Sequence, residues 1–131
     1  MYTYSYTIGK EDINYGGHVG NERALLFFQH ARMGLFESLG YSELDIGDGV
    51  GIIQKVSHVE YARELYDGDS IRVRIDGLKK ERASFTLHYT ITGGGDVAIT
   101  GYTQLVAYDY KARKIKRVPA EFLEKVADVI S

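Results

Sequence analysis

The chain has 131 residues, the length of one domain, and its 16 Lys and Arg against 18 Asp and Glu give a net charge of −2, which argues against a nucleic-acid-binding surface. The absence of cysteine excludes disulfides, thiolate metal ligands and a cysteine nucleophile. Because the sequence shows neither a signal-peptide pattern nor an apolar run of about 18 residues, we expect residues 1–131 to form a single soluble, cytoplasmic domain that does not bind membranes.

The first third of the chain predicts a strand, a tight turn and a helix. Tyrosines alternate with small polar residues over residues 1–8, which is typical of a half-buried strand. A glycine-rich turn follows over residues 11–21. Apolar residues then recur at helical spacing over residues 21–39, and Gly40 stands where a glycine commonly ends a helix.

The side of this helix that should face solvent is only partly polar. Four apolar residues lie on this side or at its edge: Leu25, Leu26, Met33 and Phe36. On a monomer these side chains would form an apolar patch of a kind that soluble proteins seldom leave uncovered. We therefore expect a homo-oligomer, either a dimer or a tetramer, in which a two-fold partner covers the helix.

The remainder of the chain is mostly β-structure. Segments with strand character over residues 50–63, 71–76, 85–92 and 97–110 follow one another with short connections, which predicts an antiparallel sheet. Gly93–Asp96 suits a hairpin turn, and Gly101 is expected to produce a kink or bulge in the last strand. Pro119 stands in the favoured first-turn position of a helix over residues 120–130. The fold class expected from this order is α+β, with one long helix against a large antiparallel sheet.

One stretch departs from the balanced charge of the chain. Residues 111–117 hold five basic side chains that alternate around Ile115. This alternation is typical of a solvent-exposed strand edge, where lysines discourage pairing with another edge. The alternative is a polyanion site, for which a CoA phosphate is the best candidate.

The turn over residues 11–21 concentrates polar chemistry. Its glycines permit the chain to reverse direction, and the helix that follows places unpaired N–H groups and a partial positive charge at its mouth. This arrangement is suited to stabilising an oxyanion. The alternative is a plain strand-to-helix connection in which an Asn or Asp side chain only caps the helix.

The order of these motifs resembles the hotdog-fold acyl thioesterases, namely the 4-hydroxybenzoyl-CoA thioesterase group and the related acyl-ACP thioesterases. The residues that carry the resemblance are Asp12–Asn21, His30-Ala31-Arg32, Val59–Glu64, Asp67-Gly68-Asp69 and Pro119. It covers essentially the whole chain and implies a hotdog fold, with a long central helix packed against a curved antiparallel sheet. It also implies an acyl-CoA or acyl-ACP thioesterase that uses water as the nucleophile and needs neither a metal nor an organic cofactor.

The chain departs from the pattern of that family at three positions. Asn14 stands where the family often has an Asp that acts as nucleophile or general base, and an amide cannot take a proton at pH 7. Ala24 replaces an aromatic residue at the helix entry and is expected to widen an acyl pocket. Leu65 occupies the position of the acyl-ACP thioesterase cysteine.

The candidate catalytic residues are Asn14, His18 and Glu60. Asn14 would orient the water or the carbonyl group. His18 would act as a base or position the substrate, the alternative being a turn histidine bonded to the backbone. Glu60 would act as a general base facing the helix N-terminus, the alternative being a solvent-facing or ion-paired strand residue. Glu64, which adjoins a turn, is expected to face solvent.

The candidate substrate-binding residues are Tyr15, Gly17, Asn21 and Ala24. By the resemblance, the backbone N–H of Asn21 is the oxyanion donor, and Tyr15 lines the acyl entrance. No metal site is predicted, because His58 shares a strand face with a glutamate but no third ligand is within reach in the sequence.

Two other functions stay open at this stage. The first is a non-catalytic acyl-CoA-binding or regulatory hotdog protein, which the missing acid at position 14 favours. The second is a hotdog hydratase or dehydratase, although such enzymes pair a histidine with an acid in a motif that is not found here.

Overall fold

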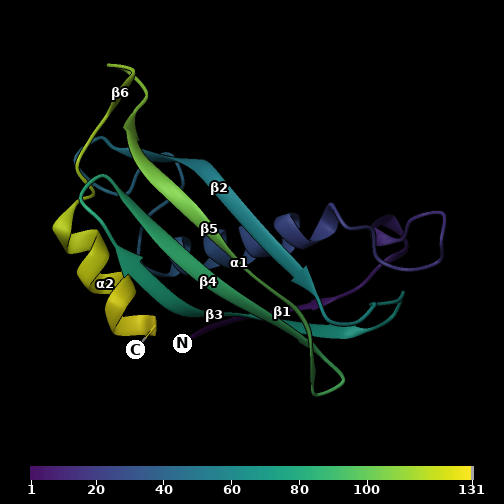
Figure 1. Ribbon diagram of the computed structural model, residues 1–131. Coiled ribbons are helices and arrows are strands. Elements are labelled where there is room, and N and C mark those ends of the chain that lie inside the picture. Colours follow the sequence, from purple (N-terminus) through teal and green to yellow (C-terminus); the bar gives the residue numbers. More distant parts are fainter. Residues whose placement is uncertain (131) are drawn as a thin grey trace.

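A computed structural model describes residues 1–130, and Ser131 of the expected domain lies outside the described residues. The elements in chain order are β1 (Tyr2–Thr7), the 3-10 helix η1 (Lys10–Asp12), α1 (Arg23–Ser38), β2 (Gly51–Tyr61), β3 (Ser70–Lys80), β4 (Ser84–Gly93), β5 (Asp96–Asp109), β6 (Lys114–Ile115) and α2 (Ala120–Ile130). Within residues 1–130 the strands form one six-stranded antiparallel sheet, and α1 and α2 are the α-helices (Figure 1). The α+β class expected from the sequence is confirmed.

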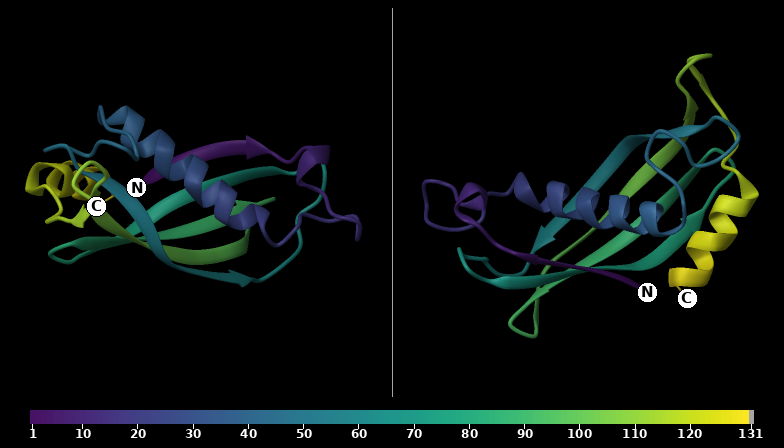
Figure 2. Two further views of the ribbon diagram at one scale, coloured as in Figure 1. Left: turned by 90° about the horizontal axis from the view of Figure 1, so that it is seen from above. Right: turned by 180° about the vertical axis from the view of Figure 1, so that it is seen from behind.

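The strand order in the sheet is β1-β3-β4-β5-β2, with β6 paired to the end of β5. The second strand of the chain therefore lies at one edge, and β1 lies at the other. The two views in Figure 2 show α1 lying across one face of the twisted sheet, while α2 packs at one end of it. This leaves the long edge strand β2 beside α1 and unpaired on its outer side.

Helix α1 is shorter than the expected range of 21–39 and has 16 residues. It begins at Arg23 because the preceding residues form a separate turn, in which the Arg23 N–H donates to the Gly20 carbonyl at 3.0 Å. The side chain of its N-cap, Glu22, makes no capping hydrogen bond, so the alternative in which an Asn or Asp side chain caps the helix does not hold. Gly40, just beyond the helix end, has a φ of 85° and ends α1 as expected.

The core lies between α1 and the inward side chains of the sheet. One stripe of α1 is fully buried, and Phe28 of this stripe stacks on Tyr89 with ring centroids 4.3 Å apart. Phe36, expected on the side that a second copy would cover, is completely buried within the chain instead. Helix α2 covers it, because Phe122 packs edge-on against its ring at 5.2 Å. Among residues 1–130, neither helix is both long and apolar enough to cross a membrane.

Gly101 plays a different part from the one expected. The pairing of β5 is regular at this residue, and the register shifts of the sheet lie elsewhere, between Gln54 and Val56 in β2 among other places. A Cβ atom at Gly101 would lie against the His58 carbonyl oxygen and 2.8 Å from a ring carbon of Phe28. Glycine is needed here because α1 and β2 both approach the backbone of β5 closely, and not because the strand bends.

Candidate active site

Asp12 anchors the first half of the turn between β1 and α1. It is only 1% exposed, and its carboxylate accepts hydrogen bonds from Tyr6 Oη at 2.7 Å, from the Gly9 N–H at 3.0 Å and from Arg23 Nη2 at 2.7 Å. Burial alone would raise the pKa of Asp12, but these hydrogen bonds outweigh it and hold the pKa below its ordinary value. Donation to this carboxylate raises the pKa of Tyr6 to about 12. Asp12 is thus placed to hold the turn together.

The second half of the turn brings Asn14 and His18 together. The Asn14 N–H donates to the His18 carbonyl at 2.9 Å, and Asn14 Oδ1 accepts from the Gly16 N–H at 2.8 Å. A Cβ atom at Gly16 would lie 3.2 Å from both Asn14 Oδ1 and His18 Nε2. Glycine at this position therefore leaves the space that the two polar side chains share.

A pocket of about 380 Å³ opens where this turn meets the end of β2. Two hydrogen bonds join the segments: the Val19 N–H donates to the Leu65 carbonyl at 2.8 Å, and Tyr61 Oη donates to the Asn21 carbonyl at 2.5 Å. Burial, with a smaller effect of Glu22, raises the pKa of Tyr61, so its hydroxyl stays protonated as the donor. The pocket is lined by His18, Val19, Asn21, Tyr61, Ala62, Arg63, Glu64, Leu65 and Ile99.

His18 and Glu64 are the titratable pair in this pocket. His18 Nδ1 lies 3.2 Å from the Val19 carbonyl oxygen, which assigns the proton of the neutral ring to Nδ1 and leaves Nε2 as an acceptor. Nε2 lies 3.9 Å from Glu64 Oε1, too far for a direct hydrogen bond. Two acceptors at this spacing can together hold one water molecule that donates to both.

Asn21 also lines the pocket, but it lies in the turn before α1 and not in the first turn of the helix itself. Its carbonyl is occupied by Tyr61. Its N–H has no backbone acceptor among residues 1–130. This free donor lies close to the positive end of the α1 dipole, which favours negative charge there.

Glu60 does not face the helix N-terminus, and that expectation is wrong. Side chains alternate along β2, and Val59 packs against the core while Tyr61 lines the pocket, so Glu60 points to the opposite face of the sheet. Its side chain is 73% exposed and lies 3.6 Å from His58 Nε2. Glu64 faces solvent as expected, with a side chain that is 58% exposed, and it also lines the rim of the pocket. The apolar pair at 59 and 61 was the signal in the sequence that assigns Glu60 to the outer face.

The other expected binding residues lie outside the pocket. Ala24 is completely buried on the core stripe of α1, so its side chain contacts the core and cannot widen this pocket. Tyr15 is fully exposed at the tip of the turn, and nothing lies within 4 Å of a Cβ atom built at Gly17. Of the expected site residues, His18 and Asn21 therefore line the pocket. Asn14 lies beside His18 and its carbonyl accepts from the Gly17 N–H at 3.1 Å, whereas Tyr15 and Ala24 lie elsewhere.

The sequence as a whole matches a known family. The pattern of the thioesterase-like superfamily matches residues 8–126 of the chain. The chain belongs to this superfamily. The match confirms the resemblance to hotdog-fold acyl thioesterases. No curated protein matches the chain in sequence.

Solved structures of several proteins share the fold. A 1,4-dihydroxy-2-naphthoyl-CoA thioesterase from Synechocystis superimposes with a TM-score of 0.87 at 17% identity, covering 99% of this chain and 98% of that one. A hypothetical protein from Staphylococcus aureus in complex with CoA gives 0.87 at 20% identity, covering 98% and 83%. The probable thioesterase YbaW from Escherichia coli gives 0.83 at 20% identity and covers 100% of both chains. At such identities the likeness shows a common fold.

Proposed function

We propose that the chain hydrolyses acyl-CoA thioesters in the pocket formed by the turn before α1 and the end of β2. The observation that carries the proposal is the His18–Glu64 pair, 3.9 Å apart in a pocket that Asn21 also lines. Membership of the thioesterase-like superfamily supports this reaction class. CoA is favoured over an acyl carrier protein because one structural neighbour contains CoA and another is a CoA thioesterase.

In this mechanism a water molecule between His18 Nε2 and Glu64 attacks the thioester carbonyl. His18 Nε2 takes the proton of the water, and the carboxylate of Glu64 stabilises the imidazolium that forms. The Asn21 N–H donates to the oxyanion of the tetrahedral intermediate. The C–S bond then breaks, and the leaving thiolate receives the proton from His18.

Asn14 has a positioning part in this scheme. Its Oδ1 is bonded to the Gly16 N–H, which leaves the Nδ2 amide to orient the carbonyl or the water. If its only task is to hold the water, Asn14→Asp should preserve or increase turnover, because one carboxylate oxygen keeps the bond from the Gly16 N–H and the other, in place of the Nδ2 donor, can accept from the water and take a proton. Thiol release from a panel of acyl-CoAs by wild type and variant in parallel measures this.

The same panel separates the proposal from the second candidate, a non-catalytic acyl-CoA-binding protein, which the amide at position 14 favours. Thiol release by the wild type supports the thioesterase. Tight acyl-CoA binding with no thiol release from any member, by wild type or by Asn14→Asp, would establish the binding protein instead.

We also propose that the protein is a homodimer, or a tetramer of such dimers, formed through β2. This strand is an unpaired edge of 11 residues, and such edges readily pair with a second strand. Beside it, Leu25 and Leu26 are partly exposed on α1, and Met33 is 48% exposed. Light scattering at micromolar concentration tests this, and a 14.7 kDa particle would contradict it.

Antiparallel pairing of two β2 strands would also give the basic segment over residues 111–117 a function. The Gly51 end of one strand would meet the Tyr61 end of the other, and Gly51 pairs with Tyr108, which adjoins the basic hairpin. The hairpin of one copy would therefore lie near the pocket of the other. We propose that it binds the CoA phosphates there. Charge-reversed lysines in this segment should raise KM for acyl-CoA more than they lower kcat.

A further inference from the structure

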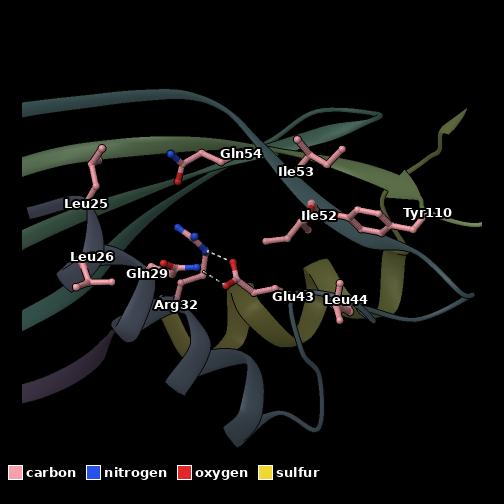
Figure 3. Close-up of a pocket in the computed structure, with 10 residues that line it drawn as sticks. All are labelled: Leu25, Leu26, Gln29, Arg32, Glu43, Leu44, Ile52, Ile53, Gln54 and Tyr110. Carbon is pink, nitrogen blue, oxygen red and sulfur yellow. Dashed lines mark hydrogen bonds and ion pairs between the residues drawn. The ribbon is translucent and has the colours of Figure 1, made fainter. Parts of the chain in front are cut away.

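A second pocket, of about 510 Å³, lies between α1 and β2 (Figure 3). Leu25, Gln29 and Arg32 line it from α1, at a spacing that places them on one face of the helix. Ile52 and Gln54 line it from β2. Leu25 lies in the first turns of α1, four residues beyond Asn21 in the chain, and the two pockets have no lining residue in common.

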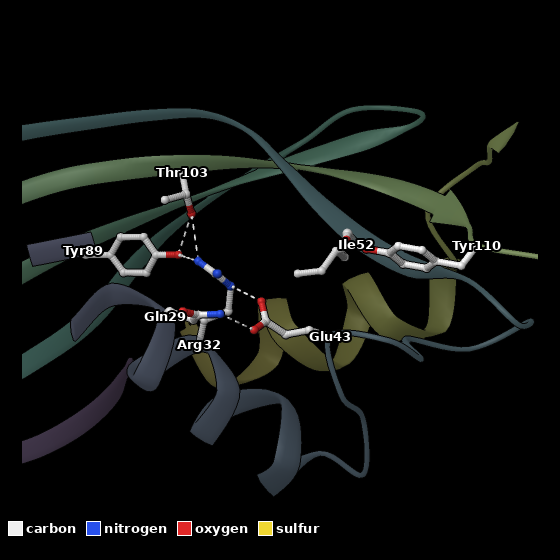
Figure 4. A network of polar contacts seen from close by, with 7 residues as sticks. All are labelled: Gln29, Arg32, Glu43, Ile52, Tyr89, Thr103 and Tyr110. Carbon is white, nitrogen blue, oxygen red and sulfur yellow. Dashed lines mark hydrogen bonds and ion pairs between the residues drawn. The ribbon is translucent and has the colours of Figure 1, made fainter. Parts of the chain in front are cut away.

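A partly buried ion pair forms one wall of this second pocket. Arg32 is 3% exposed; its Nε donates to Glu43 at 2.9 Å and its Nη1 to Tyr89 Oη at 3.1 Å (Figure 4). Thr103 shares a hydrogen bond of 2.6 Å with that same hydroxyl. Burial raises the pKa of Tyr89, which keeps the ring neutral. The wall therefore carries one positive and one negative charge and no net charge.

Several polar atoms of this pocket are left for a ligand. The guanidinium of Arg32 points toward Gln54, and its Nη2 has no hydrogen-bond partner within residues 1–130 (Figure 3). Gln29 uses its amide nitrogen on Glu43 at 3.2 Å, which leaves its oxygen free. The amide of Gln54 has no side-chain partner in the described part of the chain. A ligand here meets donors and acceptors together with the apolar surface of Leu25 and Ile52.

We infer that this pocket receives the distal end of the acyl group and selects a neutral oxygen function there, a hydroxyl or a carbonyl. A hydrocarbon end would remove water from Arg32, Gln29 and Gln54 without replacing its hydrogen bonds, which is unfavourable. A carboxylate would bring a second negative charge next to Glu43, although Glu43 already neutralises Arg32. A neutral hydroxyl satisfies the amides and the guanidinium and adds no charge.

The distance between the two pockets indicates the size of the acyl group. Arg23, the first residue of α1, and Gln29 are six residues apart, and a helix rises 1.5 Å per residue, so Gln29 lies about 9 Å along the α1 axis from the start of the helix, next to which Asn21 lies. A medium-length chain or a fused-ring aroyl group spans this distance. This inference rests on the proposed function, because it takes the thioester carbon to lie at His18 and Glu64.

The test compares three acyl groups with the same eight-carbon chain: 8-hydroxyoctanoyl, octanoyl and 7-carboxyheptanoyl. Each is used as its CoA thioester for kinetics and as a non-hydrolysable CoA thioether for equilibrium binding. The variant is Gln54→Leu, which leaves the Arg32–Glu43 pair intact. Because Gln54 lies on β2, the strand proposed to pair in the dimer, light scattering must give the same particle size for the variant and the wild type. The matched control is Gln104→Leu, because Gln104 lies on β5 opposite the bulged part of β2 and does not line the pocket.

We expect the wild type to prefer the hydroxylated thioester over octanoyl by about tenfold or more in kcat/KM, the range for leaving buried polar groups unpaired. Gln54→Leu should reduce that preference about fivefold, the range for one lost hydrogen bond, whereas Gln104→Leu should leave it unchanged. Three results would each overturn the inference and leave the proposed hydrolysis intact. They are equal kcat/KM values for the three thioesters, a preference for the thioester that ends in a carboxylate, and an unchanged preference in Gln54→Leu.

The thioethers separate this inference from the proposed function. If no thioester is hydrolysed, the proposed function fails. The dissociation constants of the thioethers still show whether the second pocket binds a neutral oxygen group. Tighter binding of the hydroxylated thioether, weakened in Gln54→Leu only, supports the polar subsite. Equal binding of the three thioethers by the wild type overturns it.

Discussion

Asp12 and His18 belong to the same turn, and their surroundings are opposite. Asp12 is 1% exposed, and its carboxylate oxygens are occupied by three neighbouring groups. The side chain of His18 is 30% exposed, and its Nε2 reaches no direct hydrogen-bond partner, since Glu64 is 3.9 Å away. A polar group whose bonding capacity is used within the chain contributes stability, whereas one left with free capacity beside a pocket is available for chemistry. Mutations around Asp12 should therefore change stability, and mutations around His18 should change turnover.

The largest effect should come from removing the buried carboxylate. Asp12→Ala leaves the Arg23 guanidinium and the Tyr6 hydroxyl without their acceptor, so we expect it to lower the free energy of unfolding by about 3–5 kcal/mol, the range for breaking a buried ion pair. Urea unfolding followed by circular dichroism measures this. Asp45→Ala is the matched control, because Asp45 accepts one exposed backbone N–H, from Gly47. Equal losses in the two variants would contradict the structural part assigned to Asp12.

In the pocket beside His18, Glu64→Gln should lower kcat for acyl-CoA hydrolysis by about 10²-fold and leave the melting temperature nearly unchanged. The amide keeps the size of the side chain but cannot stabilise the imidazolium of His18. Glu60→Gln serves as the matched control on the outer face of the sheet and should keep nearly full activity. The reverse result, with Glu60→Gln inactive and Glu64→Gln active, would move the reaction away from the His18 pocket.

Lowering the pH should have a smaller effect on stability than removing Asp12. The pKa of Asp12 is held below its ordinary value of 3.8, so the carboxylate binds its proton less readily in the folded chain than in the unfolded chain. Its contribution to stability is therefore complete above about pH 4 and is lost as the pH falls through the lowered pKa. Urea midpoints between pH 7 and pH 3 should fall more steeply for the wild type than for Asp12→Asn. Parallel curves for the two proteins would show that Asp12 is not the group responsible.

The smallest effect should come from a single donor to that carboxylate. Tyr6→Phe removes the hydroxyl that lies 2.7 Å from Asp12 but keeps the ring, which packs 5.3 Å from Phe27. We expect the free energy of unfolding to fall by about 1–2 kcal/mol, because Asp12 keeps its other donors. Turnover by the folded variant should match the wild type. A loss as large as that of Asp12→Ala would mean that the hydroxyl, and not the carboxylate, holds the turn.

Local patterns in the sequence determined the elements of this fold and their order. The alternation of apolar residues predicted the strands, Pro119 preceded a helix whose bounds of 120 and 130 are confirmed, and Gly40 marked the end of α1. These signals are local because they depend on strand and helix periods and on the backbone preferences of single residues. The candidate turn was also predictable, since its glycines, Asn14 and His18 are neighbours in the chain.

Only the tertiary structure decided which of these side chains meet. Glu60 and Glu64 are four residues apart, but the pleat of β2 sends one to the outer face while the chain beyond the strand brings the other to His18. Arg32 lies 57 residues from Tyr89, and Phe36 is covered by α2 from the far end of the chain. A periodic pattern gives two faces of an element but does not say what covers each one. That depends on contacts between distant segments, which form only when the sheet and helices pack together.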